Sequence, residues 1–295
     1  MGWQGVAIRA GMASMAMAVA QVASAQAGLR LEVEVSERGA AAPSPERWIV
    51  WLDGSRLATQ PAGREGSRVI FRGAEEVAWL VDPAQRSYFQ LDPKSAEATA
   101  AQVAGLRNGV AQGLELLSPE QRAGVKAFLG DLASAPPAAR PAVRVRSRGE
   151  AARHAGLACT RHDVLEGERR VAELCLAAYG TGPLTRERTA AVPALIAFLR
   201  RTLGPLAREI PSLRPLTPLA SLGRIEGFPL AARAAEPGGP ERTVVAVRVE
   251  EQTVEPAVFE IPAGYSRSLV PPFEARRPAP YIQGSSPWPS SGQGP

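Results

Sequence analysis

The chain has 295 residues, of which 45% are hydrophobic, and a formal net charge of +5. This is enough material for one large domain or two small ones, each with a buried core. The basic residues are almost all arginine and are interspersed with acidic residues, which argues against nucleic-acid binding because that function needs a concentrated basic face.

Residues 1–25 have the pattern of a cleavable signal peptide. Arg9 is the only charged side chain before Arg30, and the apolar run 11–22 ends near Ala23-Ser24-Ala25, where small residues occupy the positions that signal peptidase reads. The run is shorter than the roughly 20 residues that span a bilayer. The mature chain would begin at Gln26 and not at a cysteine, so we expect a soluble, unlipidated periplasmic protein without a transmembrane segment.

The mature chain opens with a predicted antiparallel meander. In residues 29–35 Leu or Val alternates with Arg or Glu, which is the period of a strand. Short runs rich in β-branched and aromatic residues follow, separated by Gly, Asp-Gly or Asp-Pro turns, at 47–53, 55–60, 67–72, 77–81 and 87–92. The run from Trp48 to Leu52 is apolar on both faces, so we expect both sides of the sheet to be covered there.

A helical segment is predicted over 93–134. Asp92-Pro93 can start a helix, and Ser118 with Gln121 forms a capping-box pattern that starts a second one. Val125, Phe128, Leu129 and Leu132 then form an apolar helical stripe.

The second half of the chain returns to strands. They are expected at 142–148, in a hairpin of 154–165 with 169–179, and at 223–235, 242–254 and 257–262. Val245, Val247 and Val249 alternate strictly in the second of the last three. A helix is expected over 190–209, with an apolar side formed by Leu195, Phe198, Leu199 and Leu203. Residues 268–295 are rich in Pro, Ser and Gly, which is typical of a disordered tail.

The chain has two cysteines, Cys159 and Cys175. They are equidistant from Gly167, so they face each other if the hairpin turns at 166–168. Opposed strand residues have Cα atoms about 4.5–5.5 Å apart, within the range of a disulfide, and an exported chain favours that bond. Free or redox-active thiols are an alternative, although a C-x-x-C motif is absent.

A metal site is the other alternative for the cysteine hairpin, since His154, Cys159, His162 and Cys175 together offer two imidazoles and two thiols. Cys159 and His162 are three residues apart, however, and therefore point to opposite faces of a strand. We expect a disulfide, no metal and no cofactor.

The sequence predicts no catalytic residues. His162 and Asp163 are neighbours on a strand and face opposite ways, and the G-x-S-x-G, H-E-x-x-H, P-loop and dinucleotide-binding patterns are absent. A hydrolase is the remaining enzymatic alternative. Arg144, Arg146 and Arg148 form a row on one strand face; this row is either a contact for lipid phosphates or an acidic partner, or a solvated face.

Four segments resemble parts of an uncharacterised family of exported bacterial proteins, a domain of unknown function that is similar in architecture to the LolA/LolB-type lipoprotein carriers. They are VAWLVDPAQRSYFQLDP (77–93), GLACTRHDVLEGERRVAELCLA (156–177), GFPLAAR (227–233) and FEIPAGY (259–265). The resemblance implies one α+β domain over 26–267, in which a curved antiparallel sheet, an unclosed β-barrel, wraps around helices. In the carriers the concave face holds acyl chains. The family has no established catalytic residues to carry over.

A sheet with an apolar face must be covered, and incomplete cover leaves an apolar groove that can bind a ligand. Eight side chains are candidates for such a groove, or else for an ordinary core: Trp48, Val50, Val69, Phe71, Val77, Trp79, Phe89 and Leu91. The sequence thus predicts a non-enzymatic periplasmic protein that binds an acyl chain, a lipoprotein or another apolar ligand. The alternative is a cell-envelope protein-interaction module whose interior is fully packed.

Overall fold

The computed structural model describes residues 27–38, 45–63, 66–129, 142–209, 225–235 and 241–269. The predicted signal peptide and the predicted tail beyond residue 269 lie outside the described residues, as does the end of the helical segment predicted to reach residue 134.

The fold is α+β and is built on one unclosed sheet of twelve strands in the order β12-β6-β5-β4-β3-β2-β1-β11-β10-β9-β8-β7. All neighbours are antiparallel except β12 and β6, which run parallel. The strands are β1 (Ala27–Arg38), β2 (Glu46–Asp53), β3 (Arg56–Pro61), β4 (Arg68–Arg72), β5 (Val77–Asp82), β6 (Ser87–Leu91), β7 (Val143–His154), β8 (Leu157–Glu166), β9 (Arg169–Ala177), β10 (Phe228–Ala235), β11 (Glu241–Thr253) and β12 (Ser266–Ser268).

Two halves of the chain meet at the first strand. The meander β1–β6 follows chain order, because short turns such as Asp53-Gly54 favour pairing of consecutive strands. β1 also pairs along its whole length with β11, from Ala27 opposite Thr253 to Arg38 opposite Glu241. This long-range pairing joins the meander to β7–β11 in a single sheet.

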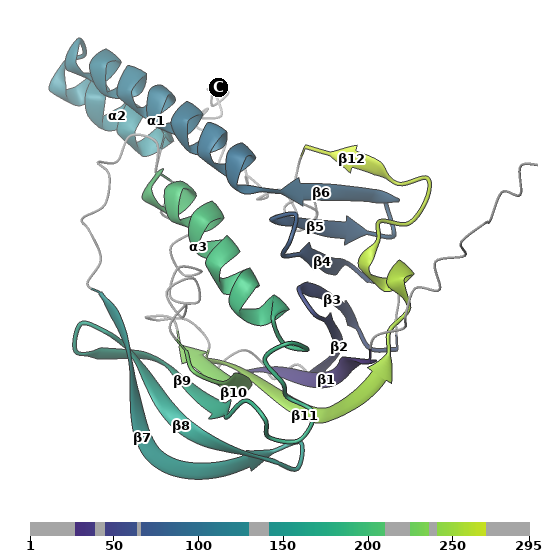
Figure 1. Cartoon of the computed structure of the whole chain (residues 1–295). Helices are drawn as coiled ribbons and strands as arrows, with labels where there is room; N and C mark the ends of the chain where they lie inside the picture. The colour runs from purple at the N-terminus through teal and green to yellow at the C-terminus, as the bar shows by residue number, and fades with distance from the viewer. Residues whose placement is uncertain are drawn as a thin grey trace, which may run out of the picture.

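The helix α3 (Ala191–Glu209) lies in the concavity of the sheet, which curves around it (Figure 1). The Ala191 backbone N–H donates to the Gly54 carbonyl at 2.8 Å and so ties the start of α3 to the β2–β3 turn. Phe198 is fully buried, with its ring centroid 5.2 Å from that of Phe71 on β4. The apolar side predicted for this helix, with Leu195 and Leu199 beside Phe198, packs against the main core cluster.

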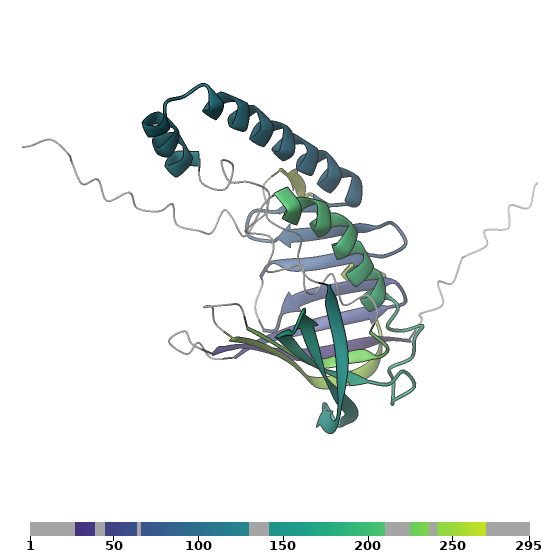
Figure 2. The ribbon, with the colours of Figure 1, turned by 90° about the vertical axis from the view of Figure 1, so that its left-hand side faces the viewer.

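The helices α1 (Pro93–Glu115) and α2 (Pro119–Leu129) extend beyond one end of the sheet (Figure 2). The Asp92 side chain caps α1 as predicted, and Ser118 and Gln121 exchange the two hydrogen bonds of a capping box. The buried Arg107 guanidinium pairs with the Glu209 carboxylate and carbonyl, which joins α1 to the end of α3. Neither α1 nor any other described helix has the length and apolarity of a bilayer span.

A second apolar cluster covers the opposite face of the meander. Residues 257–262 were expected to form a strand, but Pro256–Phe259 form the 3-10 helix η3. The fully buried Phe259 packs there with Ala58, Ile70 and Val81. Val50 and Leu52 face the main cluster and Trp51 faces this one, so the sheet is covered on both sides at the run that is apolar on both faces.

Two strand details differ from the sequence prediction. The register of β1 with β11 shifts between Glu32 and Val33, so Val247 is an extra residue in β11 without a partner in the ladder. This bulge breaks the expected alternation of valines, and the Val247 side chain is 38% exposed. His154 ends β7 instead of starting the next strand, because Ala155 and Gly156 form a tight turn with φ of 50° and 77°.

Candidate functional site

The candidate site is the concave face of the meander, next to α3. Ladder pairing places two rows of side chains on this face. The row beneath α3 is Leu29, Leu52, Leu57, Phe71, Ala78 and Leu91, and the next row is Leu31, Val50, Thr59, Val69, Leu80 and Phe89. Trp48 lies beside the second row, two residues along β2 from Val50. Six of the eight predicted groove residues therefore share this face.

The other two predicted groove residues, Val77 and Trp79, lie on the opposite face. The β4–β5 turn pairs Arg72 with Val77, so that odd-numbered residues of β4 face the same way as even-numbered residues of β5. Trp79 packs against the cluster around Phe259, and the Arg72 guanidinium stacks 5.3 Å from its ring centroid. Leu80 takes the place on the concave face, and sequence reasoning missed it because β5 is apolar at both odd and even positions.

The two rows differ in burial. Leu29, Leu52, Leu57, Phe71 and Ala78 are all buried beneath α3, and Leu91 packs against them. In contrast, five side chains of the second row and its margin are only half-buried: Trp48, Val50, Val69, Leu80 and Phe89. We call these five the apolar strip. Apart from Val50, they belong to none of the buried clusters formed by the described residues.

The apolar strip carries no ionisable group. Thr59, which lies between Val50 and Val69, is the one polar residue in the second row. A half-buried surface of this kind gains free energy when an apolar ligand covers it, at about 25 cal/mol per Å². The side chains of the strip are all apolar, and they offer no acid, base or nucleophile.

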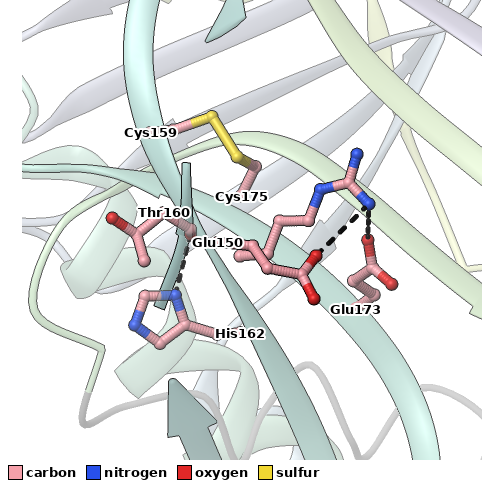
Figure 3. Close-up of a disulfide and its surroundings, with 7 residues drawn as sticks. Glu150, Cys159, Thr160, His162, Glu173 and Cys175 are labelled. Atoms are coloured by element: carbon pink, nitrogen blue, oxygen red, sulfur yellow. Dashed lines mark hydrogen bonds and ion pairs between the residues drawn. A yellow bond between two sulfur atoms is a disulfide. The ribbon is translucent and has the colours of Figure 1, made fainter. Parts of the chain in front are cut away.

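The cysteine hairpin lies elsewhere, on β8 and β9. Cys159 and Cys175 form a disulfide with Cα atoms 5.4 Å apart, and both residues are buried (Figure 3). The two cysteines are not directly opposite each other as the sequence suggested. The turn pairs Glu166 with Arg169, one step from the predicted register, and a bulge between Val164 and Leu165 adds a second step. Cys175 therefore pairs with Arg161 and the bond runs diagonally.

The two histidines have separate surroundings. His162 Nδ1 is 2.9 Å from the Thr160 carbonyl oxygen, on the side away from the disulfide (Figure 3). Asp163 points to the other face, where it pairs with Arg146 at 3.4 Å and Arg170 at 3.6 Å, so it does not orient His162. Of the four residues weighed as metal ligands, the structure groups His154, Cys159 and Cys175 and leaves out His162.

The arginine row lies on the face of β7 opposite Val143 and Val145, as expected, and each member has an acidic partner. Arg144 pairs with Glu168 at 2.7 Å and Arg146 with Asp163 at 3.4 Å. Arg148 pairs with Glu150 at 2.6 Å and with Glu173 at 3.3 Å. The opposite charges within each pair neutralise each other, so a phosphate would have to compete with the carboxylates that already contact the arginines.

No family model matches the chain, and no curated protein matches it. Solved structures that are similar to it include the following three, each at 10% sequence identity. The match to a structure of MucB covers 81% of this chain and 58% of the MucB chain, with a TM-score of 0.35. The match to the MucA/MucB complex of Pseudomonas aeruginosa covers 80% of this chain and 56% of the matched chain, with a TM-score of 0.34. A putative outer membrane lipoprotein-sorting protein domain from Vibrio parahaemolyticus covers 79% and 88%, with 0.28. The chain thus spans less than two thirds of the MucB chains it matches.

Proposed function

We propose that this protein is an exported, non-enzymatic binding protein that holds an acyl chain, or another apolar ligand of similar size, on the concave face of its sheet. The observation that carries the proposal is the apolar strip. Its five side chains line the same face as the core row beneath α3, but they remain half-buried. A folded protein gains little from presenting such a surface to water, and a bound hydrocarbon would complete its burial.

The proposal is tested by lipid extraction and native mass spectrometry of the full chain purified from the periplasm of an expression host. We expect a copurifying lipid in the wild-type protein and its loss in Phe89→Glu, which places a charge in the strip. Leu106→Glu is the matched control, because Leu106 is 62% exposed and lies on α1, outside both rows of the concave face. Absence of lipid from repeated wild-type preparations, or equal loss in both variants, would refute the proposal.

Export is part of the same proposal. Residues 1–25 are proposed as the signal peptide and residues 26–267 as one domain. N-terminal sequencing of the periplasmic protein should begin at Gln26. A chain that retains Met1 and stays in the cytoplasm would contradict this part without touching the binding proposal.

An envelope protein-interaction module is the second candidate. The buried residues of the row beneath α3 favour it, because α3 already fills part of the concavity. Leu106 on α1 and Leu116 just after it, which is 88% exposed, also present apolar surface. A photo-crosslinker placed at position 106 would then yield a discrete protein adduct in intact cells, whereas one at position 89 would yield none. The binding proposal predicts the reverse, with a lipid adduct at position 89.

A further inference from the structure

Three potential metal ligands converge at the ends of β7, β8 and β9. One ring nitrogen of His154 and the sulfurs of Cys159 and Cys175 all lie within 4.8 Å of one another. Both cysteines are buried and His154 is half-buried. The group lies away from the apolar strip and plays no part in the proposed function.

Local structure explains why His154 joins the cysteines and His162 does not. The tight turn at Ala155-Gly156 pairs Ala152 with Cys159 and His154 with Leu157, which places His154 on the same face as Cys159 and one step nearer the turn. His162 is three residues from Cys159 on the same strand and therefore lies on the other face. The chain thus brings together one imidazole and two sulfurs from three adjacent strands.

We propose that reduction of the Cys159–Cys175 disulfide converts this group into a Cys2His site for Zn²⁺. A dithiol donor reduces the disulfide to two thiols and is itself oxidised to a disulfide, so two electrons and two protons are transferred. Zn²⁺ then displaces the two thiol protons and binds both thiolates and the neutral imidazole. A water completes the tetrahedral shell, as in zinc sites with three protein ligands.

The geometry and the charge both fit this ion. Tetrahedral Zn²⁺ with bonds of about 2.3 Å to sulfur and 2.0 Å to nitrogen needs ligand atoms roughly 3.5–3.8 Å apart. The three atoms are already within 4.8 Å, so small side-chain rotations complete the site once the sulfurs are free to separate. Two thiolates neutralise the dication, so the loaded site leaves no net charge in the core. Thiolate and imidazole are also ligands that suit zinc.

The test uses the full mature chain in oxidised and phosphine-reduced forms, titrated anaerobically with Zn²⁺ against a chromophoric chelator. We expect one Zn²⁺ per reduced chain and none per oxidised chain. His154→Gln should weaken binding by the reduced chain at least tenfold, since it removes one of three protein ligands. His162→Gln is the matched control and should bind as the wild type does.

Two further measurements separate a built site from binding by an unfolded chain. Co²⁺ added to the reduced chain should give thiolate-to-metal charge-transfer absorption that is absent from a Cys159→Ser/Cys175→Ser variant. Zn²⁺ should also raise the melting temperature of the reduced chain but not of the oxidised one. Unchanged affinity in His154→Gln, a loss in His162→Gln equal to that in His154→Gln, or equal zinc binding by the oxidised chain would each overturn the proposal.

Discussion

The Cys159–Cys175 disulfide closes a loop between residues 16 apart in sequence and holds β8 against β9 within the main core cluster. A crosslink of this span restricts the unfolded chain more than the folded one. The effect of the disulfide on stability is therefore the same whether the two cysteines lie directly opposite each other or diagonally across the two strands.

Reduction should lower the free energy of unfolding by about 3 kcal/mol, the value that loop closure predicts for this span. The measurement is urea-induced unfolding of the metal-free protein with and without a phosphine reductant. A Cys159→Ser/Cys175→Ser variant serves as the control and should be insensitive to the reductant. A similar loss of stability on adding the reductant to that variant would show that the reductant acts on something other than the disulfide.

Asp92 provides a second prediction at the level of a single residue. Its partial burial alone would raise the pKa of the carboxyl, but hydrogen bonds from the Ser95 backbone N–H, the Ser95 hydroxyl and Gln90 together hold that pKa below its ordinary value. The folded state thus binds a proton at Asp92 less readily than the unfolded state. The cap stabilises the protein above the unfolded pKa and loses its effect as pH falls through the folded one.

Asp92→Ala should cost about 1 kcal/mol at neutral pH. That cost should shrink as the pH falls below about 4, because the unfolded-state carboxylate takes up a proton there more readily than the folded-state one. Asp92→Asn retains an oxygen that can accept from Ser95 and should keep most of the stability, but without the pH dependence. The measurement is chemical denaturation of the three proteins across pH 3–7. A cost for Asp92→Ala that does not change with pH would contradict the capping role of the carboxylate.

Among the elements, α3 does most to organise the concave face. It is tied to the β2–β3 turn at one end and to Arg107 of α1 at the other, and Phe198 packs against Phe71 between them. The 3.6-residue spacing of its apolar side chains made the helix predictable. Nothing in that spacing says how many rows of the sheet the helix covers, which is why the half-buried strip appears only in the structure.

Phe198→Ala should destabilise the protein by about 3–5 kcal/mol, because it removes a fully buried aromatic ring and leaves a cavity against Phe71. Arg200→Ala, on the exposed side of the same helix, should change stability by less than about 0.5 kcal/mol. Both values come from denaturant unfolding. Similar costs for the two variants would show that α3 does not pack as described.

The attachment of α1 depends on Arg107. This buried guanidinium pairs with Glu209, and its removal would leave the Glu209 carboxylate without that partner. Arg107→Ala should cost about 3 kcal/mol and should speed hydrogen exchange in α1. The neighbouring exposed residue supplies the control, since Leu106→Ala should leave exchange in α1 nearly unchanged. Unaltered exchange in Arg107→Ala would mean that α1 is held by other contacts.

At the scale of the whole molecule, β1 joins two groups of strands that are far apart in sequence. It pairs with β2 on one side and with β11 on the other, and the strands from β12 to β7 form one continuous sheet. We propose that residues 26–267 unfold as one cooperative unit, because separating the halves would break the long β1–β11 ladder.

The described tryptophans, Trp48, Trp51 and Trp79, all lie in the meander, so their fluorescence reports on that half of the sheet. Val164→Ala, in the buried cluster of the β8–β9 half, should lower stability by about 2 kcal/mol. A single unit requires that tryptophan fluorescence and far-ultraviolet circular dichroism show the same lowered midpoint. Ile70→Ala, which lies in the meander itself, is the reference variant for a substitution close to the tryptophans. A shift in circular dichroism without one in fluorescence would divide the chain into two domains.

The sequence by itself determined most strand positions, the starts of α1 and α2 and the pairing of the two cysteines, because these follow from local periodicity, capping residues and the cysteine count. The tertiary structure decided which face each side chain occupies. The length of the β4–β5 turn moved Val77 and Trp79 off the concave face and brought Leu80 onto it, and the tight turn at Ala155-Gly156 placed His154 beside the cysteines. A shift of one residue in a strand moves every side chain to the other face of the sheet. Turns and bulges therefore determine which residues meet, and the hydrophobic periodicity does not reveal how long they are.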